Sequence, residues 1–258
     1  MFLTIMKHLN IWSVTVINKH KKIKIMKKLT LFAVAVFVFQ FSFGQAVRDR
    51  NVIPVAVNLN QVLRMTISNG GNIEFTFNTI DQYKNGISGD QATSTSAGTV
   101  AANPMYVTDF IVASSTRWKI TYGAEEATFI GTDNPANTLA LNNVGYSITE
   151  SGTHGFETGG AKGTTAGEEL WSIPTNAATE VAALQAYPIV LIEDNDSGTQ
   201  ANAGDETDNA FQLVWRCGTV EGQGDTTPMN AQNLIDQQPS PTPDRYVVNV
   251  LFDLAIDN

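Results

Sequence analysis

Short apolar segments with a two-residue alternation are the feature that most narrows what this chain can fold into. In residues 72–77 the apolar side chains Ile73, Phe75 and Phe77 fall on one face, which is the period of a half-buried β-strand. Residues 62–67 alternate in the same way, and Ser-Asn-Gly-Gly separates the two segments. Turns of this composition join antiparallel strands, so this part of the chain predicts a β-hairpin.

Similar segments recur along the rest of the chain, separated by loops rich in Gly, Ser, Thr and Asn. They cover residues 52–57, 106–113, 117–122, 144–148, 187–192, 211–216 and 245–254. Trp118, Ile120 and Tyr122 share one face of their segment. Only residues 175–184, which are rich in alanine, favour a helix. We therefore predict an all-β chain in which residues 45–258 form a single β-sandwich of about ten short antiparallel strands with long polar loops.

The first 44 residues have the composition of an export signal. Residues 26–44 begin with a methionine and two lysines, continue with an apolar run and end at the small residues Ser42 and Gly44, as a cleaved signal peptide does. The apolar run is shorter than the ~20 residues of a membrane-spanning helix, so we expect no transmembrane segment after cleavage. Residues 1–25 are basic, and we interpret them as upstream sequence translated before the true start codon or as a long n-region.

The charge of the exported part is strongly negative. The leader holds seven of the 16 basic residues and no acidic one, so nine basic residues remain against 25 acidic residues, a net charge near −16. Such a surface repels nucleic acid and anionic lipid headgroups, and we expect no nucleic-acid partner. Cys217 is the single cysteine, so no intrachain disulfide forms, and its strand-like surroundings predict a small buried hydrophobe.

The chain carries few of the residues that catalysis needs. His154 is the only histidine after the leader, whereas zinc sites use several His or Cys ligands. No serine lies in a Gly-x-Ser-x-Gly pattern, and no glycine-rich phosphate-binding loop is present. We therefore predict that the protein is not an enzyme. A glycoside hydrolase that uses a pair of carboxylates is the remaining enzymatic alternative, because 25 acidic residues offer many pairs.

One acidic segment suggests a metal site. Residues 193–198 read Glu-Asp-Asn-Asp-Ser-Gly and place side-chain oxygens at alternate positions before a glycine, as Ca²⁺ coordination favours. The segment is not an EF-hand, because Gly198 stands at the third acidic position. We predict a structural calcium site on Asp194 and Asp196, with a solvated acidic turn as the alternative.

Two further residues are candidates for contact with carbohydrate. Trp118 and Trp215 have apolar strand neighbours and are expected in the core. Trp171 follows Glu-Glu-Leu in a loop-like segment, so it is the tryptophan that we expect to be exposed and able to stack on a glycan. Thr226 lies in Asp-Thr-Thr, which is similar to a short bacterial O-glycosylation motif.

Several segments resemble known surface proteins. The leader, which ends in Ser-Phe-Gly-Gln, resembles those of Bacteroidota. Residues 107–120 form a strand, a turn and Trp-x-aliphatic, and residues 245–254 place Phe252 after a tyrosine. Both are similar to motifs of WxL-type surface domains. In those domains a leucine stands at the position of Ile120, and a tryptophan stands at the position of Phe252. The resemblance implies a β-sandwich located at a cell surface.

Taken together, these features predict an exported, non-catalytic surface protein with a structural or adhesive role. Self-association by strand addition would make it a subunit of an extracellular assembly, and other cell-surface components are alternative partners. We expect an extracellular or cell-surface location, with the periplasm as an alternative. A glycan- or cell-wall-binding module is the second functional candidate, and the carboxylate-pair hydrolase is the third.

Overall fold

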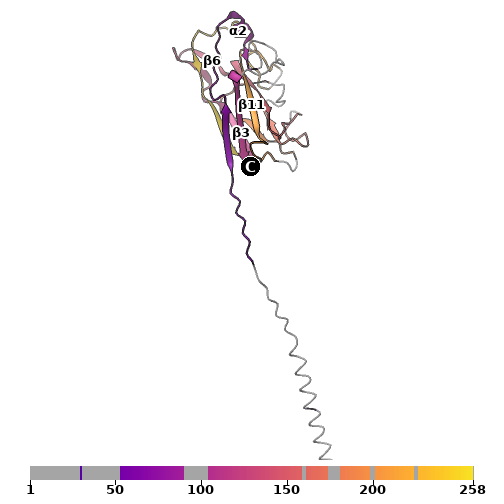
Figure 1. Cartoon of the computed structure of the whole chain (residues 1–258). Coiled ribbons are helices and arrows are strands. Elements are labelled where there is room, and N and C mark those ends of the chain that lie inside the picture. The colour runs from indigo at the N-terminus through magenta and orange to yellow at the C-terminus, as the bar shows by residue number, and fades with distance from the viewer. Residues whose placement is uncertain are drawn as a thin grey trace, which may run out of the picture. The chain divides into compact units, whose positions relative to one another are not determined.

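The computed structural model describes residues 53–89, 104–158, 161–173, 181–197, 201–223 and 226–257, together with Thr30. Apart from Thr30, the predicted leader therefore lies outside the described residues. The chain divides into two compact units, Met1–Asn58 and Leu59–Asn258. All described strands lie in the second unit, which is almost entirely β-structure, and the predicted all-β sandwich-like fold is confirmed (Figure 1).

The first sheet has the order β1-β3-β11-β7-β9, and β2 pairs with β11. Every pairing in it is antiparallel. The long strands β3 and β11 are neighbours in this sheet (Figure 1). Its strands are β1 (Leu63–Asn69), β2 (Ile87–Ser88), β3 (Val107–Ser114), β7 (Val144–Glu150), β9 (Ala182–Ala183) and β11 (Ala210–Cys217).

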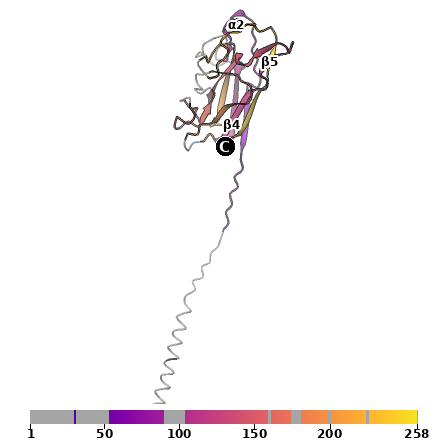
Figure 2. The same cartoon turned by 180° about the vertical axis from the view of Figure 1, so that it is seen from behind.

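The second sheet has the order β13-β4-β10-β8, and a third, smaller sheet has the order β12-β5-β6. Strands β4 and β5 are labelled in the view from behind (Figure 2). The second sheet consists of β4 (Trp118–Ala124), β8 (Leu170–Ser172), β10 (Ile189–Asp194) and β13 (Val250–Ile256). The third consists of β5 (Thr128–Gly131), β6 (Thr138–Ala140) and β12 (Tyr246–Val247).

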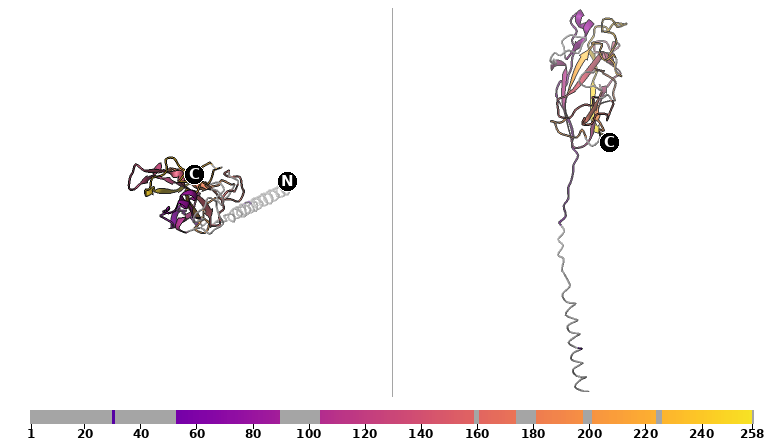
Figure 3. Two further views of the ribbon diagram at one scale, coloured as in Figure 1. Left: turned by 90° about the horizontal axis from the view of Figure 1, so that it is seen from above. Right: turned by 90° about the vertical axis from the view of Figure 1, so that its right-hand side faces the viewer.

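The hydrophobic core lies between the first two sheets. Trp118, Ile120 and Tyr122 of β4 are fully buried, so the predicted apolar face is confirmed. The ring of Tyr122 meets Tyr146 of β7 edge-on at 5.2 Å, which joins the second sheet to the first. A side view shows the domain with β11 of the first sheet in orange and β13 of the second in yellow (Figure 3). Trp215 is also buried, as expected.

The predicted hairpin does not form. Among the described strands, β1 pairs with β3 alone, and residues 72–77 belong to no strand. The reason is the turn after β1, where Gly70 has a φ of +68° and approaches the Val107 carbonyl so closely that a Cβ would overlap it. The chain thus crosses the start of β3 instead of returning along β1, and Phe75 stacks on Tyr106 with ring centroids 4.7 Å apart.

The prediction of a helix at residues 175–184 is also wrong for the residues of this segment that the structure describes. Residues 174–180 lie outside the described part, and Ala182–Ala183 form strand β9. Between the described strands β1 and β2 an α-helix forms instead, α2 (Ile80–Asn85), which begins at a capping box between Thr79 and Gln82. Two short 3₁₀ helices cover Pro104–Tyr106 and Leu141–Asn143.

Two further strand predictions need correction. Residues 53–57 form no strand and are exposed, because nothing in the described part pairs with them. Residues 245–254 were expected to form one strand, but Val248 and Asn249 interrupt it and leave β12 and β13 in different sheets. The single predicted sandwich therefore has an additional small sheet at one end.

Candidate functional site

A groove of about 690 Å³, lined by both apolar and polar residues, opens beside the end of β1 and the start of β13. One wall consists of residues 70–77 and the other of residues 241–250 with Phe252. The groove reaches into the core between the sheets, where it is lined by Val144, Leu184, Trp215 and Cys217. These four core side chains are buried, so the groove borders the core without exposing it.

Both walls of the groove have the alternation of a strand. Ile73, Phe75 and Phe77 are half-buried against the core, whereas the residues between them are exposed. Val248 and Val250 on the opposite wall show the same pattern, again with exposed residues between them. The two walls therefore present apolar side chains toward the core at the two-residue spacing of β-structure.

The backbone of one wall is left without partners. Among the described residues, no N–H or C=O group of residues 71–77 makes a backbone hydrogen bond. On the other wall, β12 pairs only with β5, and β13 pairs only with β4. Unpaired strand edges are templates for pairing with another chain, so the groove combines an apolar floor with backbone groups free to accept an additional strand.

A second exposed apolar feature precedes β1. We name residues 53–59 the arm, and in it Ile53, Val55, Val57 and Leu59 have exposed fractions of 82%, 84%, 76% and 91%. These four side chains occupy every second position, and the arm contains no charged residue. Clustered exposed apolar side chains of this kind mark interaction sites in soluble proteins.

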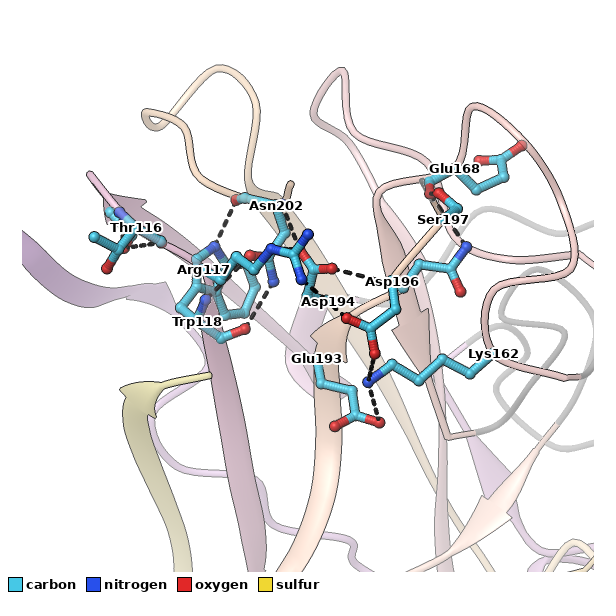
Figure 4. Close-up of polar contacts among 12 residues, drawn as sticks. Thr116, Arg117, Trp118, Lys162, Glu168, Glu193, Asp194, Asp196, Ser197 and Asn202 are labelled. Carbon is cyan, nitrogen blue, oxygen red and sulfur yellow. Dashed lines mark hydrogen bonds and ion pairs between the residues drawn. The ribbon is translucent and has the colours of Figure 1, made fainter. Parts of the chain in front are cut away.

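The predicted calcium residues lie in a network of ion pairs (Figure 4). Arg117 Nη1 is 3.0 Å from Asp196 Oδ1, and Arg117 Nε is 3.6 Å from Asp194 Oδ2. Lys162 Nζ lies 3.0 Å from Asp196 Oδ2 and 3.2 Å from Glu193 Oε1. Burial lowers the pKa of Lys162, but its hydrogen bonds to Asp196 and Glu193 and the attraction of their charges together outweigh burial and raise the pKa overall.

Asp194 additionally shapes the acidic loop. Its Oδ1 accepts a hydrogen bond from the backbone N–H of Asp196 at 2.8 Å, and its Oδ2 accepts one from the N–H of Asn202 at 3.0 Å. The described residues contain no group of three or more His, Cys, Asp or Glu side chains placed to hold a metal ion. Gly198 lies outside them, so calcium binding at Asp194 and Asp196 stays a prediction, in competition with the two cationic side chains.

Trp171 occupies a different environment from the one predicted. It lies in strand β8, opposite Glu193 of β10, and is half-buried. Its indole Nε1 is buried without a hydrogen-bond partner in the described part of the chain. The expected loop position is therefore wrong, and only part of the ring is available for the predicted glycan contact.

The remaining sequence candidates are spread over the domain. Thr226 is exposed, as a modification site requires, and its glycosylation stays a prediction. Cys217 is buried as predicted, and burial raises the pKa of its thiol to about 12. His154 lies in a loop beside Asn209, with Nδ1 and Oδ1 3.0 Å apart.

The carboxylates between β7 and β10 have well-defined partners. Glu157 is buried and accepts hydrogen bonds from Thr164, Thr165 and Asn195. Burial raises the pKa of Glu168, and the nearby carboxylates, Glu169 first, raise it further. The hydrogen bonds of Glu157 join the loops that flank β8, which is a structural role.

Comparison with known proteins does not assign this chain to a family. No family model matches the chain, and no curated protein matches its sequence. Within the part of the chain that is described, no helix has the length and apolar character needed to span a bilayer. Functional inference therefore rests on the groove, the arm and the sequence itself.

Proposed function

We propose that this protein is an exported, non-catalytic structural or adhesive protein that acts as a subunit of an extracellular assembly. The observation that carries the proposal is the groove, where half-buried apolar side chains lie along a wall whose residues 71–77 make no backbone hydrogen bond in the described structure. Exposed apolar surface and unpaired edges of this kind favour association with another chain.

The chemistry of the groove is that of a binding surface. Its walls offer Ile73, Phe75 and Val248, together with backbone donors and acceptors. Strand addition uses these two components, since main-chain hydrogen bonds supply affinity and pockets for alternate side chains supply specificity. A partner in the groove would also bury the half-buried apolar side chains of its walls, so association and stability would be linked.

The location follows from the sequence. Residues 26–44 have the parts of a cleaved signal peptide, and the net charge of the exported part, near −16, favours solubility outside the cytoplasm. The resemblance of residues 107–120 and 245–254 to WxL-type domains supports a cell-surface location.

Sedimentation of the native protein, sheared gently from its source cells, tests the proposal. A subunit of an assembly pellets as a polymer at speeds that leave a single chain in solution, since its mass even with the leader is 27.9 kDa. Recovery of the protein only as a soluble monomer would contradict the proposal, and a polysaccharide-binding screen would then test the glycan-binding alternative.

A further inference from the structure

We propose that the occupant of the groove is the arm of a second copy of this chain, inserted as an additional strand. Copies would then join head to tail, with the arm of each chain in the groove of the next. This inference rests on the proposed function, because it names the partner and the contact by which the assembly would form.

The apolar pattern of the arm matches that of the groove. Ile53, Val55, Val57 and Leu59 occupy every second position of the arm, and each is more than three-quarters exposed. The groove offers an apolar floor flanked by two walls with the same two-residue spacing. One face of an inserted arm would therefore be buried against the core, as the side chains of a central strand are.

The length of the arm matches the unpaired wall. The arm has seven residues, and residues 71–77, whose backbone groups make no backbone hydrogen bond in the described structure, are also seven. Seven residues of a strand span roughly 23 Å. Only Pro54 lacks an N–H group, and a proline near the start of a strand is tolerated.

The connection to β1 favours a second copy over the chain's own groove. Val62 is fixed to Ser115 by two hydrogen bonds, from its N–H to Oγ at 2.9 Å and from the Ser115 N–H to its carbonyl at 3.0 Å. Only Asn60 and Gln61 separate the arm from this anchor, so insertion into the same chain requires a reversal within two residues. Insertion into another copy requires none, and such a head-to-tail contact produces a filament when the rotation between copies does not close a ring.

Electrostatics predict how the association depends on salt. Each exported chain carries a net charge near −16, so copies repel one another at long range. The arm is uncharged, and its contact is apolar. Screening of the repulsion at 0.15 M salt, where the Debye length is about 8 Å, should therefore promote polymer formation relative to low salt.

Two charge substitutions in the full exported chain test the inference. Val57→Asp places a carboxylate on the apolar face of the arm, and Val248→Asp places one on the wall of the groove. Each variant alone should fail to polymerise and should sediment as a monomer. An equal mixture should form a species of twice the monomer mass, because the intact arm of the Val248→Asp chain still fits the intact groove of the Val57→Asp chain.

Matched controls lie on the opposite faces. Ala56→Asp changes the other face of the arm, and Leu251→Asp changes an exposed position of β13 next to the groove residue Val250. Both controls should polymerise like the native chain. Polymer that survives Val57→Asp, or a mixture that stays monomeric although both variants retain the native circular dichroism, would overturn the inference.

Photocrosslinking supplies a readout that does not depend on folding of the groove variant. A photoreactive p-benzoylphenylalanine at position 55 should yield covalent dimers whose crosslink maps to residues 71–77 or 241–252 of the other chain. A crosslink within one chain, or one outside the groove, would overturn the inference. If the native protein pellets as a polymer but the crosslink maps elsewhere, this inference fails while the proposed function stands. If the native protein is a monomer, both fail.

Discussion

The side-chain amide of Asn202 makes two hydrogen bonds to the backbone of Trp118. Its Oδ1 accepts from the Trp118 N–H at 3.1 Å, and its Nδ2 donates to the Trp118 carbonyl at 2.7 Å. The indole Nε1 of Trp118 in turn donates to the backbone carbonyl of Asn202 at 2.7 Å. Both residues are fully buried, so this exchange fixes the start of β4 to the loop after β10.

Replacing Asn202 by alanine should therefore destabilise the domain strongly. Asn202→Ala leaves the N–H and C=O of Trp118 buried without these partners, and each orphaned group costs about 1–3 kcal/mol. We expect the free energy of unfolding, measured by urea denaturation, to fall by about 3 kcal/mol. The exposed Asn60 provides the control, and Asn60→Ala should change the stability by less than about 0.5 kcal/mol. Equal effects of the two variants would contradict this role of Asn202.

The stability of the domain should depend on whether one or both partners of a buried ion pair on β11 are replaced. Arg216 Nη1 lies 3.0 Å from Glu221 Oε1, and their side chains are 1% and 10% exposed. Glu221→Gln removes a charged partner from the buried guanidinium and should cost about 3 kcal/mol. The double variant Arg216→Met, Glu221→Leu should be more stable than Glu221→Gln, because it removes the buried guanidinium together with this carboxylate. A double variant less stable than Glu221→Gln would refute this explanation.

The thiol of Cys217 should make stability fall at alkaline pH. Burial raises the pKa of Cys217 from 9.0 to about 12, so between these values the folded chain binds more protons than the unfolded chain. The contribution of the buried neutral thiol to the free energy of unfolding is complete below pH 9. It is lost as the pH rises toward 12, by about 1.4 kcal/mol per pH unit. The stability difference between the native chain and Cys217→Ala, measured by denaturation, should shrink between pH 8 and pH 10.5. A difference that is constant with pH would contradict the pKa shift.

Calcium should raise the melting temperature if Asp194 and Asp196 bind it. The sequence-based hypothesis predicts an increase in millimolar CaCl₂ that is absent in Asp196→Asn, because ligand binding to the folded state stabilises it. Magnesium at the same concentration controls for ionic strength. An unchanged melting temperature would sink the calcium hypothesis and leave Arg117 and Lys162 as the partners of these carboxylates.

The strand content of the fold could be predicted from the sequence, because the core strands are strongly patterned. Residues 117–122 and 211–216 alternate or run apolar in ways that only buried β-structure satisfies, and β4 and β11 form there. Helix α2 was missed because it is six residues long and lies next to a Gly- and Ser-rich segment. Its Thr79-x-x-Gln82 capping box was the signal that could have revealed it.

The groove could not be predicted, because it depends on how segments far apart in sequence are placed. Residues 72–77 have the alternation of a paired strand, and the close contact of Gly70 with Val107, which directs them away from β1, is a tertiary effect. The arm has the same local pattern as the core strands, and only its exposure in the structure distinguishes it from them. A pattern of side chains specifies that a segment can be a strand, and it leaves the pairing partner open.

The most direct test of the account is a high-resolution reconstruction of filaments formed by the native protein. We predict continuous density in the groove between residues 71–77 and the wall before Phe252, traceable to Ile53, Val55, Val57 and Leu59 of the adjacent subunit. Filaments in which the groove is empty, or in which the chain's own arm occupies it, would contradict the account.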